Sequence, residues 1–249
     1  MKNALTIARK ELRVYFVSPL FYVITALFVF LFAVFFAGTV IQSKTANFGS
    51  TFSITQFVMI FVVPLLTMRL IAQEKQQGTI EILLTNPVRD VEVVVGKFLA
   101  GVGMFLSMLA FTLVSVLFLL WTAVDKQKFL FFNVGKIDFG PILAGYLGFT
   151  LLVCGFIAIG IFASSLTQNQ IIAALISFAF LIVLIIGSSI GPIFFGPPLS
   201  DAMAYIGSSS HLDAFSRGAI SLPDLVYTLS MISIPLYLAV VALGARKWH

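Results

Sequence analysis

One polar stretch between two very apolar segments carries most of the chain's candidate contact chemistry, and it covers residues 69–90. Acidic and amide side chains fall near one helical face at Glu74, Gln77 and Glu81. Apolar side chains recur at spacings of three and four residues, at Ile80, Leu83 and Leu84. A helix with these two faces suits docking into a groove on a soluble partner. The alternative is a connector resting on lipid, but such a helix would prefer lysine and arginine on its polar face.

The same stretch is expected to turn and then start a second helix. Asn86 precedes Pro87, and the residue before a proline is biased away from helical conformation. Asp90 can cap the following helix, because its carboxylate can accept hydrogen bonds from backbone N–H groups at a helix start. We therefore expect a short helix, a turn and a helix that leads into the next apolar segment.

Elsewhere the reactive side chains form no recognisable catalytic set. His211 has one acidic neighbour in the sequence, Asp213, but no cluster of metal ligands, so we expect no metal site. The single cysteine, Cys154, lies inside an apolar segment and is expected to pack there. The sequence also lacks the Gly-x-x-x-x-Gly-Lys-Ser/Thr phosphate loop, so the chain cannot hydrolyse ATP by that route. We predict that it is not an enzyme and holds no cofactor itself.

The composition requires a membrane. Apolar residues make up 60% of the 249 positions and charged residues 10%, with a mean hydropathy of +1.08, so a water-soluble domain would lack polar surface. Six continuous apolar stretches are each long enough to cross a bilayer as a helix, at residues 20–41, 54–72, 98–121, 142–166, 171–190 and 225–244. A closed barrel would show alternating apolar and polar residues instead. We predict an all-α integral membrane protein whose residues 1–249 form one transmembrane domain.

Charge is nearly excluded from these six stretches. None contains Asp, Glu, His or Lys, and Arg69 lies only at the end of the second. Carriers driven by an ion gradient keep titratable or charged groups inside the membrane, so this alternative is weak. The energy for any transport must then come from another subunit.

The basic residues predict the orientation, because lysine and arginine near helix ends favour the cytoplasm. Ten of the 15 lie on the side of the two termini: Lys2, Arg9, Lys10, Arg13, Arg69, Lys75, Arg89, Lys97, Arg246 and Lys247. Both termini are therefore expected in the cytoplasm, together with the loop at 73–96 and a short turn at 167–170. The segment 191–224 is expected on the other side.

The segment before the first span is amphipathic. Its basic arc consists of Lys2, Arg9, Lys10 and Arg13, and the opposite face carries Leu5, Ala8, Leu12, Tyr15 and Phe16. We expect an interfacial helix over residues 1–18 whose basic side chains contact anionic membrane lipid. Ser18-Pro19 would end it with a sharp turn. The alternative is a solvated basic tail.

Glycines and prolines predict features of the packing. Small residues in the fourth span allow close helix approach, at Gly145, Gly148, Gly155 and Gly160. The fifth span is expected to break where Gly191-Pro192 and Gly196-Pro197-Pro198 follow it, giving a broken-helix hairpin over 191–224 before the last span.

The stretch 74–88 resembles a family signature. It reads Glu-Lys-Gln-Gln-Gly-Thr-Ile-Glu-Ile-Leu-Leu-Thr-Asn-Pro-Val and is followed by Gly96-Lys97-Phe98. This looks like the acidic-x-x-x-Gly-Thr-x-Glu-x-Leu-Leu-x-x-Pro-Val pattern of ABC-2 type exporter permeases. Within that family it most resembles the permease subunit of gliding motility and the permease of nitrous oxide reductase maturation. The resemblance extends over the whole chain, including Arg217 to Ile220 and Leu225 to Tyr227 near the last span.

The resemblance implies a place for an ATPase. Residues 74–90 would form the coupling helix region that meets a nucleotide-binding subunit, with the turn at 165–170 as its lesser companion. The implied coupling residues are Glu74, Gln77, Gly78, Thr79, Glu81, Leu83, Leu84, Pro87, Arg89 and Asp90. The amino-terminal segment would be an elbow helix beside the ATPase.

The resulting hypothesis is a permease subunit of an ABC-2 type exporter in the bacterial plasma (inner) membrane. A second permease, the same or a related chain, would complete the pathway, and two ABC ATP-binding subunits would hold ATP and Mg. Membrane lipid is an expected partner and nucleic acid is not. The alternative is a membrane scaffold for an ATPase-driven mechanical or gliding-motility complex that moves no cargo.

Overall fold

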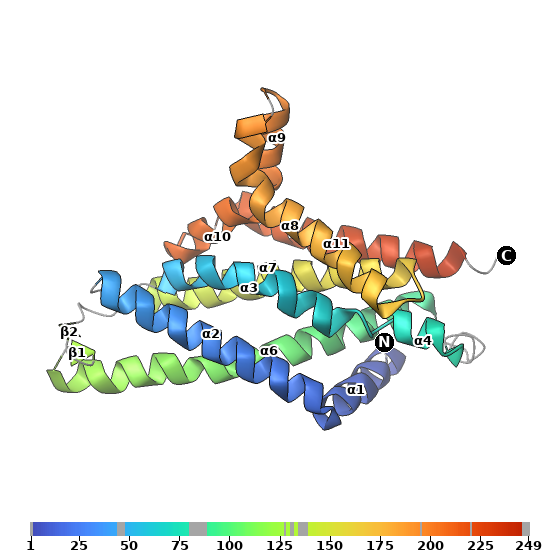
Figure 1. Cartoon of the computed structure of the whole chain (residues 1–249), viewed down its shortest axis with the longest axis horizontal. Coiled ribbons are helices and arrows are strands. Elements are labelled where there is room, and N and C mark those ends of the chain that lie inside the picture. The colour runs from blue at the N-terminus through green and yellow to red at the C-terminus, as the bar shows by residue number, and fades with distance from the viewer. Residues whose placement is uncertain are drawn as a thin grey trace.

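The computed structural model in Figure 1 describes residues 2–43, 48–79, 89–126, 128–129, 132–133, 139–194, 196–219 and 221–245. Its helices are α1 (Lys2–Val17), α2 (Pro19–Ser43), α3 (Phe48–Thr67), α4 (Ala72–Gln76), α6 (Asp90–Lys126), α7 (Phe139–Leu166), α8 (Gln170–Phe194), α9 (Leu199–Ile206), α10 (Ser208–Ser216) and α11 (Leu222–Gly244). A minimal antiparallel pair follows α6, with β1 (Lys128–Phe129) beside β2 (Phe132–Asn133).

Helices dominate the described residues, and six of the helical segments are long and apolar enough to cross a membrane. They are Pro19–Gln42, Phe48–Gln76, Asp90–Ser115, Gly140–Leu166, Gln170–Gly187 and Leu222–Gly244. The prediction of an all-α protein with six spans is confirmed, since the β1–β2 pair adds only four residues in strands.

The spans pack around α7. In the most apolar 18-residue stretch of α7, 67% of the residues are buried, whereas in that of α11 only 17% are. Helix α7 is therefore central and α11 peripheral. Helices α3, α8, α10 and α11 all contact α7, while α1 packs along α6. Fully buried aromatic rings fill the centre, among them Phe28, Phe32, Phe52, Phe105 and Phe149. The outer faces of α8 and α11 expose large apolar side chains, such as Leu175 and Leu229, as contact with a bilayer or another apolar surface requires.

The expected close approaches at the glycines of α7 are present. A Cβ on Gly145 would lie 2.9 Å from the ring of Phe52 in α3, and one on Gly155 would lie 2.9 Å from Met231 in α11. Gly148 faces Phe215 of α10, and Gly160 faces Thr67 of α3, even more tightly. Small residues on α7 therefore let three neighbouring helices approach its backbone.

The expected break at Gly191-Pro192 is wrong. Helix α8 continues through both residues to Phe194, and the next helix begins at Leu199, directly after Pro197-Pro198. A single internal proline removes one backbone donor, and helices of membrane proteins tolerate this. The consecutive prolines leave two positions without a backbone donor, and the helix does not extend through them.

The bundle has two distinct ends (Figure 1). At one end, here named the terminal end, lie α1, α4, the turn between α7 and α8, and the carboxy-terminal end of α11. The opposite, far end holds the start of α3 and the helix α10. Helix α9 and the last turns of α8 project away from the bundle axis. Ser18 alone separates α1 from α2, so the expected turn at Ser18-Pro19 is present, while an in-plane position of α1 stays a prediction.

Candidate functional site

A buried lysine joins three helices at the terminal end. The side chain of Lys97, in the second turn of α6, is fully buried. Its Nζ lies 2.8 Å from Oε2 of Glu74 in α4 and 3.3 Å from Oε1 of Glu11 in α1. It also donates a hydrogen bond to the carbonyl of Leu70. Because a buried ammonium is strongly destabilising without partners, these contacts make Lys97 a fixed attachment point for α1 and α4.

A fourth residue completes this group, the Lys97 cluster, which consists of Lys10, Glu11, Glu74 and Lys97. Lys10 Nζ lies 3.6 Å from Glu74 and 3.8 Å from Glu11. Two cations therefore face two carboxylates, and the cluster has no net formal charge. The side chains of Glu11 and Glu74 are 11% and 15% exposed, whereas that of Lys10 is 60% exposed. The strong contacts are thus those of Lys97, because water screens Lys10.

A glycine allows these charges to meet. Helix α1 lies on α6 through the buried residues Ala4, Ile7 and Ala8. A Cβ on Gly96 would lie 2.7 Å from the carbonyl oxygen of Ala4 and 2.9 Å from Cβ of Ile7. Any larger side chain at position 96 would therefore push α1 away from α6. Gly96 therefore allows α1 to pack closely on α6, and this packing brings Glu11 of α1 to the ammonium group of Lys97.

Helix α4 is also attached to the last turn of α7, next to the turn that leads into α8. Ser164 Oγ accepts hydrogen bonds from the backbone N–H groups of Ile71 (3.2 Å) and Ala72 (2.9 Å), which satisfies two donors at the start of α4. The same hydroxyl donates to the carbonyl of Met68 at 3.1 Å. Beyond it, Lys75 Nζ donates to the carbonyl of Ser165. The two segments that the family resemblance assigns to ATPase contact are therefore in direct contact with each other.

A tyrosine one turn after Glu11 adds another link between α1 and the bundle. Tyr15 is buried, and its hydroxyl donates to the carbonyl of Leu66 at 2.7 Å. Burial raises the pKa of Tyr15 above its ordinary value, so the hydroxyl keeps the proton that it donates. Helix α1 is thus fixed to the end of α3 as well as to α6.

The sequence-derived coupling residues fall into three groups. Gln77, Gly78 and Thr79 are exposed just after α4, and Arg89 is exposed just before α6. Asp90 is the first residue of α6, and next to it the Arg89 N–H donates to Glu92 Oε2 at 3.3 Å. Glu74 faces inward to the Lys97 cluster. The remaining four lie outside the described residues: Glu81, Leu83, Leu84 and Pro87.

The faces of α1 differ in part from the expectation. Arg9, Lys10 and Arg13 are exposed and, with Thr6 and Val14, line a groove of about 480 Å³. Of the expected apolar face, Ala8 and Tyr15 are buried and Leu12 is half-buried, but Leu5 and Phe16 are exposed. The cause is that α1 packs on protein: the face towards α6 is centred on Ala4, Ile7, Ala8 and Glu11. The side chain of Lys2 lies outside the described part.

Gly78 leads to a prediction about the turn after α4. Its φ is +69°, and a Cβ there would meet nothing within 4 Å, so Gly78→Ala changes only the backbone preference. The left-handed conformation costs an alanine about 1 kcal/mol more than glycine. We expect amide hydrogen exchange at Gln77 and Gly78 to become about fivefold faster. Gly78→Asn should be milder, because asparagine tolerates this conformation. Equal exchange in all three proteins would contradict the assigned turn.

At the far end, His211 has a different partner from the one expected. Its Nδ1 lies 2.6 Å from Oδ1 of Asp224 in α11, whereas Asp213 accepts a hydrogen bond from Ser53. His211 Nε2 lies 3.0 Å from the carbonyl oxygen of Tyr205, and the ring stacks on Tyr227 at 3.8 Å between centroids. The contact between His211 and Asp224 therefore links α10 to α11, and the second ring nitrogen contacts the end of α9.

The Lys97 cluster was not identified from the sequence. Lys97 contributed to the count of basic residues and to the family resemblance through Gly96-Lys97-Phe98, and Glu11 contributed to none of the predicted sites. A usable signal was present, however, because a lysine seven residues into a long apolar helix needs carboxylates nearby. Glu11 is also the only acidic residue among the basic ones of α1.

Comparison with known proteins agrees with this arrangement at the level of the family. No individually curated protein matches the sequence. The family model described as "ABC-2 family transporter protein" matches residues 5–248. This range includes all six spans and the whole Lys97 cluster. The chain therefore belongs to the ABC-2 family of transporter proteins.

Proposed function

We propose that the chain is the permease subunit of an ABC exporter and that α4, with the exposed residues that follow it, receives the motion of a separate ATP-binding subunit. Membership of the ABC-2 family implies a partnership with such a subunit. The observation that supports the finer assignment is the Lys97 cluster. It attaches α4 to α1 and α6 through buried charges, while Gln77, Gly78 and Thr79 remain accessible.

The contacts explain how a movement of α4 reaches the membrane. Separating Glu74 from Lys97 would remove the shortest ion pair of a fully buried cation, which is unfavourable, so α4 and α6 are expected to move together. Glu11 couples α1 to the same motion, and Ser164 couples the turn before α8. A displacement of α4 is therefore expected to move α6, α1 and the segment before α8. This is a rigid-body mechanism, in which packed helices shift as units.

The proposed setting is the bacterial plasma membrane with the terminal end in the cytoplasm. The basic side chains of α1, Arg9, Lys10 and Arg13, would then face anionic headgroups, which are abundant at the cytoplasmic surface. ATP and Mg would be held by two ATP-binding subunits. A second permease, identical or related, would cover part of the apolar surface of the bundle.

The proposal is tested by co-expression with an ABC ATP-binding subunit encoded beside the chain. We expect the two to co-purify in detergent and ATP turnover in liposomes to depend on both. Charge reversal at the accessible Arg89 should weaken the complex, whereas Arg217→Glu at the far end should not. Failure to co-purify, or equal effects of both reversals, would contradict the assignment. ATP turnover that moves no cargo with any candidate substrate would favour the mechanical scaffold.

A further inference from the structure

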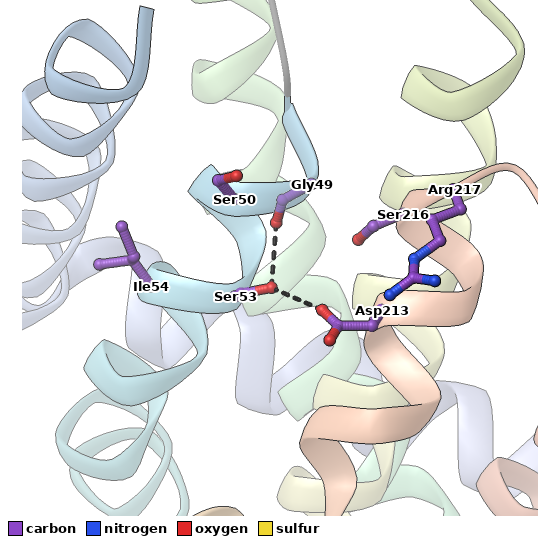
Figure 2. Close-up of a pocket in the computed structure, with 7 residues that line it drawn as sticks. All are labelled: Gly49, Ser50, Ser53, Ile54, Asp213, Ser216 and Arg217. Carbon is purple, nitrogen blue, oxygen red and sulfur yellow. Dashed lines mark hydrogen bonds between the residues drawn. The ribbon is translucent and has the colours of Figure 1, made fainter. Parts of the chain in front are cut away.

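A polar pocket lies at the far end of the bundle, between the first turns of α3 and the last turn of α10 (Figure 2). Its volume is about 370 Å³, within the range of roughly 300–1,000 Å³ that is usual for small-molecule sites. The lining residues are Gly49, Ser50, Ser53, Ile54, Asp213, Ser216 and Arg217. None belongs to the Lys97 cluster, so the pocket has no part in the proposed contact with the ATP-binding subunit.

The pocket presents both signs of charge. Asp213 belongs to α10 and Arg217 follows its last residue, and both side chains line the pocket (Figure 2). No ion pair within 4.0 Å joins them in the described part of the chain. The single hydroxyl proton of Ser53 has two acceptors within reach, Asp213 Oδ1 at 3.2 Å and the carbonyl of Gly49 at 3.1 Å. Ser53 thus holds the carboxylate at the pocket wall.

One of the lining residues carries a hydroxyl that has no partner within the described part of the protein. Ser216 Oγ is inaccessible to solvent and makes no hydrogen bond within the described residues. In Figure 2 it points from α10 towards α3, and Ile54 points to the other side of α3. A buried hydroxyl without a partner is unfavourable by about 1–3 kcal/mol. A ligand oxygen bound between Ser216 and Arg217 would satisfy it.

The depth of the pocket matches lipid headgroups. Helix α3 has 20 residues from Phe48 to Thr67, a length of about 30 Å, which is the thickness of the hydrocarbon core. The membrane-crossing segment that includes α3 begins at Phe48, so its first turn, with Gly49 and Ser50, is expected where acyl chains meet headgroups. Backbone N–H groups at a helix start favour a phosphate, as does a guanidinium.

We propose that this pocket binds the phosphoethanolamine headgroup of a membrane lipid. The phosphate contacts Arg217, Ser216 and the start of α3, and the ammonium donates to the carboxylate of Asp213. A phosphatidylglycerol headgroup brings no cation for Asp213, and its negative charge is repelled there. A phosphatidylcholine headgroup brings a cation, but its quaternary nitrogen has no N–H to donate. The pair of opposite charges therefore selects an amine that can donate hydrogen bonds.

Binding of short-chain lipids to the purified chain in detergent tests this site. The probes are the dihexanoyl forms of phosphatidylethanolamine, phosphatidylcholine and phosphatidylglycerol, together with free phosphoethanolamine, each titrated by calorimetry. We expect phosphatidylethanolamine to bind about tenfold more tightly than the other two lipids. The reason is that only its ammonium group can donate a charge-assisted hydrogen bond to Asp213, in a pocket that is open to solvent. Equal affinity for the three lipids overturns the proposal. Equal affinity of free phosphoethanolamine and its lipid overturns the lipid as the source.

Two variants separate the charges from the fold. Asp213→Asn keeps an oxygen that can accept from Ser53 but removes the charge, so phosphatidylethanolamine and phosphatidylglycerol should then bind equally. Arg217→Gln should weaken both about tenfold. Arg217 is exposed, so this variant is expected to fold. The matched control is Arg89→Gln at the terminal end, an exposed arginine with no assigned lipid contact, which should bind like the unmodified chain. Retained selectivity in Asp213→Asn, or an equal loss in the control, contradicts the site.

Discussion

Replacement of Lys97 by methionine is expected to lower the free energy of unfolding by about 3–5 kcal/mol, because it removes the cation between two nearly buried carboxylates. Methionine can occupy the position of the apolar stem, so the loss reports the charge and its hydrogen bonds rather than a cavity. The unfolding transition of the detergent-solubilised chain measures it. In a complex with the ATP-binding subunit, the same variant should separate ATP turnover from transport, since α4 is no longer attached to α6.

The matched control is Lys10→Met. Lys10 contacts the same two carboxylates at 3.6 and 3.8 Å, but its side chain is 60% exposed. An exposed pair contributes less than about 1 kcal/mol, so this variant should unfold almost like the unmodified chain. Adding Glu74→Gln to Lys97→Met should recover part of the loss by removing one orphaned charge. Equal effects of the two lysine variants would show that burial of Lys97 has no energetic role.

Gly160→Ala is expected to destabilise the bundle by about 1–3 kcal/mol, because the new methyl group overlaps a side chain that cannot move away. A Cβ at this position would lie 2.8 Å from Cβ of Thr67 and overlap its hydroxyl. Thr67 is fully buried, and its hydroxyl donates to the carbonyl of Val63 at 2.9 Å. The unfolding midpoint in detergent measures the effect. Gly148→Ala should act in the same direction, with a Cβ 2.7 Å from Cδ2 of Phe215.

Gly38→Ala in α2 provides the opposite case. A Cβ there meets no atom within 4 Å, so the substitution changes only the helix preference. It should stabilise the protein by about 0.5–1 kcal/mol, because alanine loses less backbone entropy than glycine in a helix. If Gly160→Ala were also neutral or stabilising, the close approach of α3 and α7 would be wrong.

Much of the fold could be predicted from the sequence because its cause is local. A continuous apolar run of about 20 residues can satisfy its backbone in a bilayer only as a helix, so the number and type of spans followed from hydropathy. The glycines of α7 indicated tight packing for a similar reason. The length of α8 was harder to predict. A proline such as Pro192 removes one backbone N–H donor, and whether the helix continues depends on how the surrounding residues compensate for its loss.

The candidate site could be predicted only in part, because its contacts are long-range. Lys97 and Glu11 are 86 positions apart, and only the packing of α1 on α6 at Gly96 brings them together. His211 shows the same limit. Asp213 is two positions away and therefore on another side of the helix, whereas Asp224 reaches the ring from α11. The sequence predicted a docking segment through its helical spacing and its family resemblance, but not the partners that hold α4 in place.

The central claim is that the surface just after α4 meets an ATP-binding subunit, and site-specific photocrosslinking tests it most directly. A photoreactive phenylalanine would replace the exposed Gln77 in one variant and, in another, the exposed Ala202 of α9, the helix that projects away from the bundle axis. In membranes that contain the ATP-binding subunit, we expect a crosslink to that subunit from position 77 and none from position 202. A crosslink from position 202, or none from position 77 in a complex that still co-purifies, would contradict the claim.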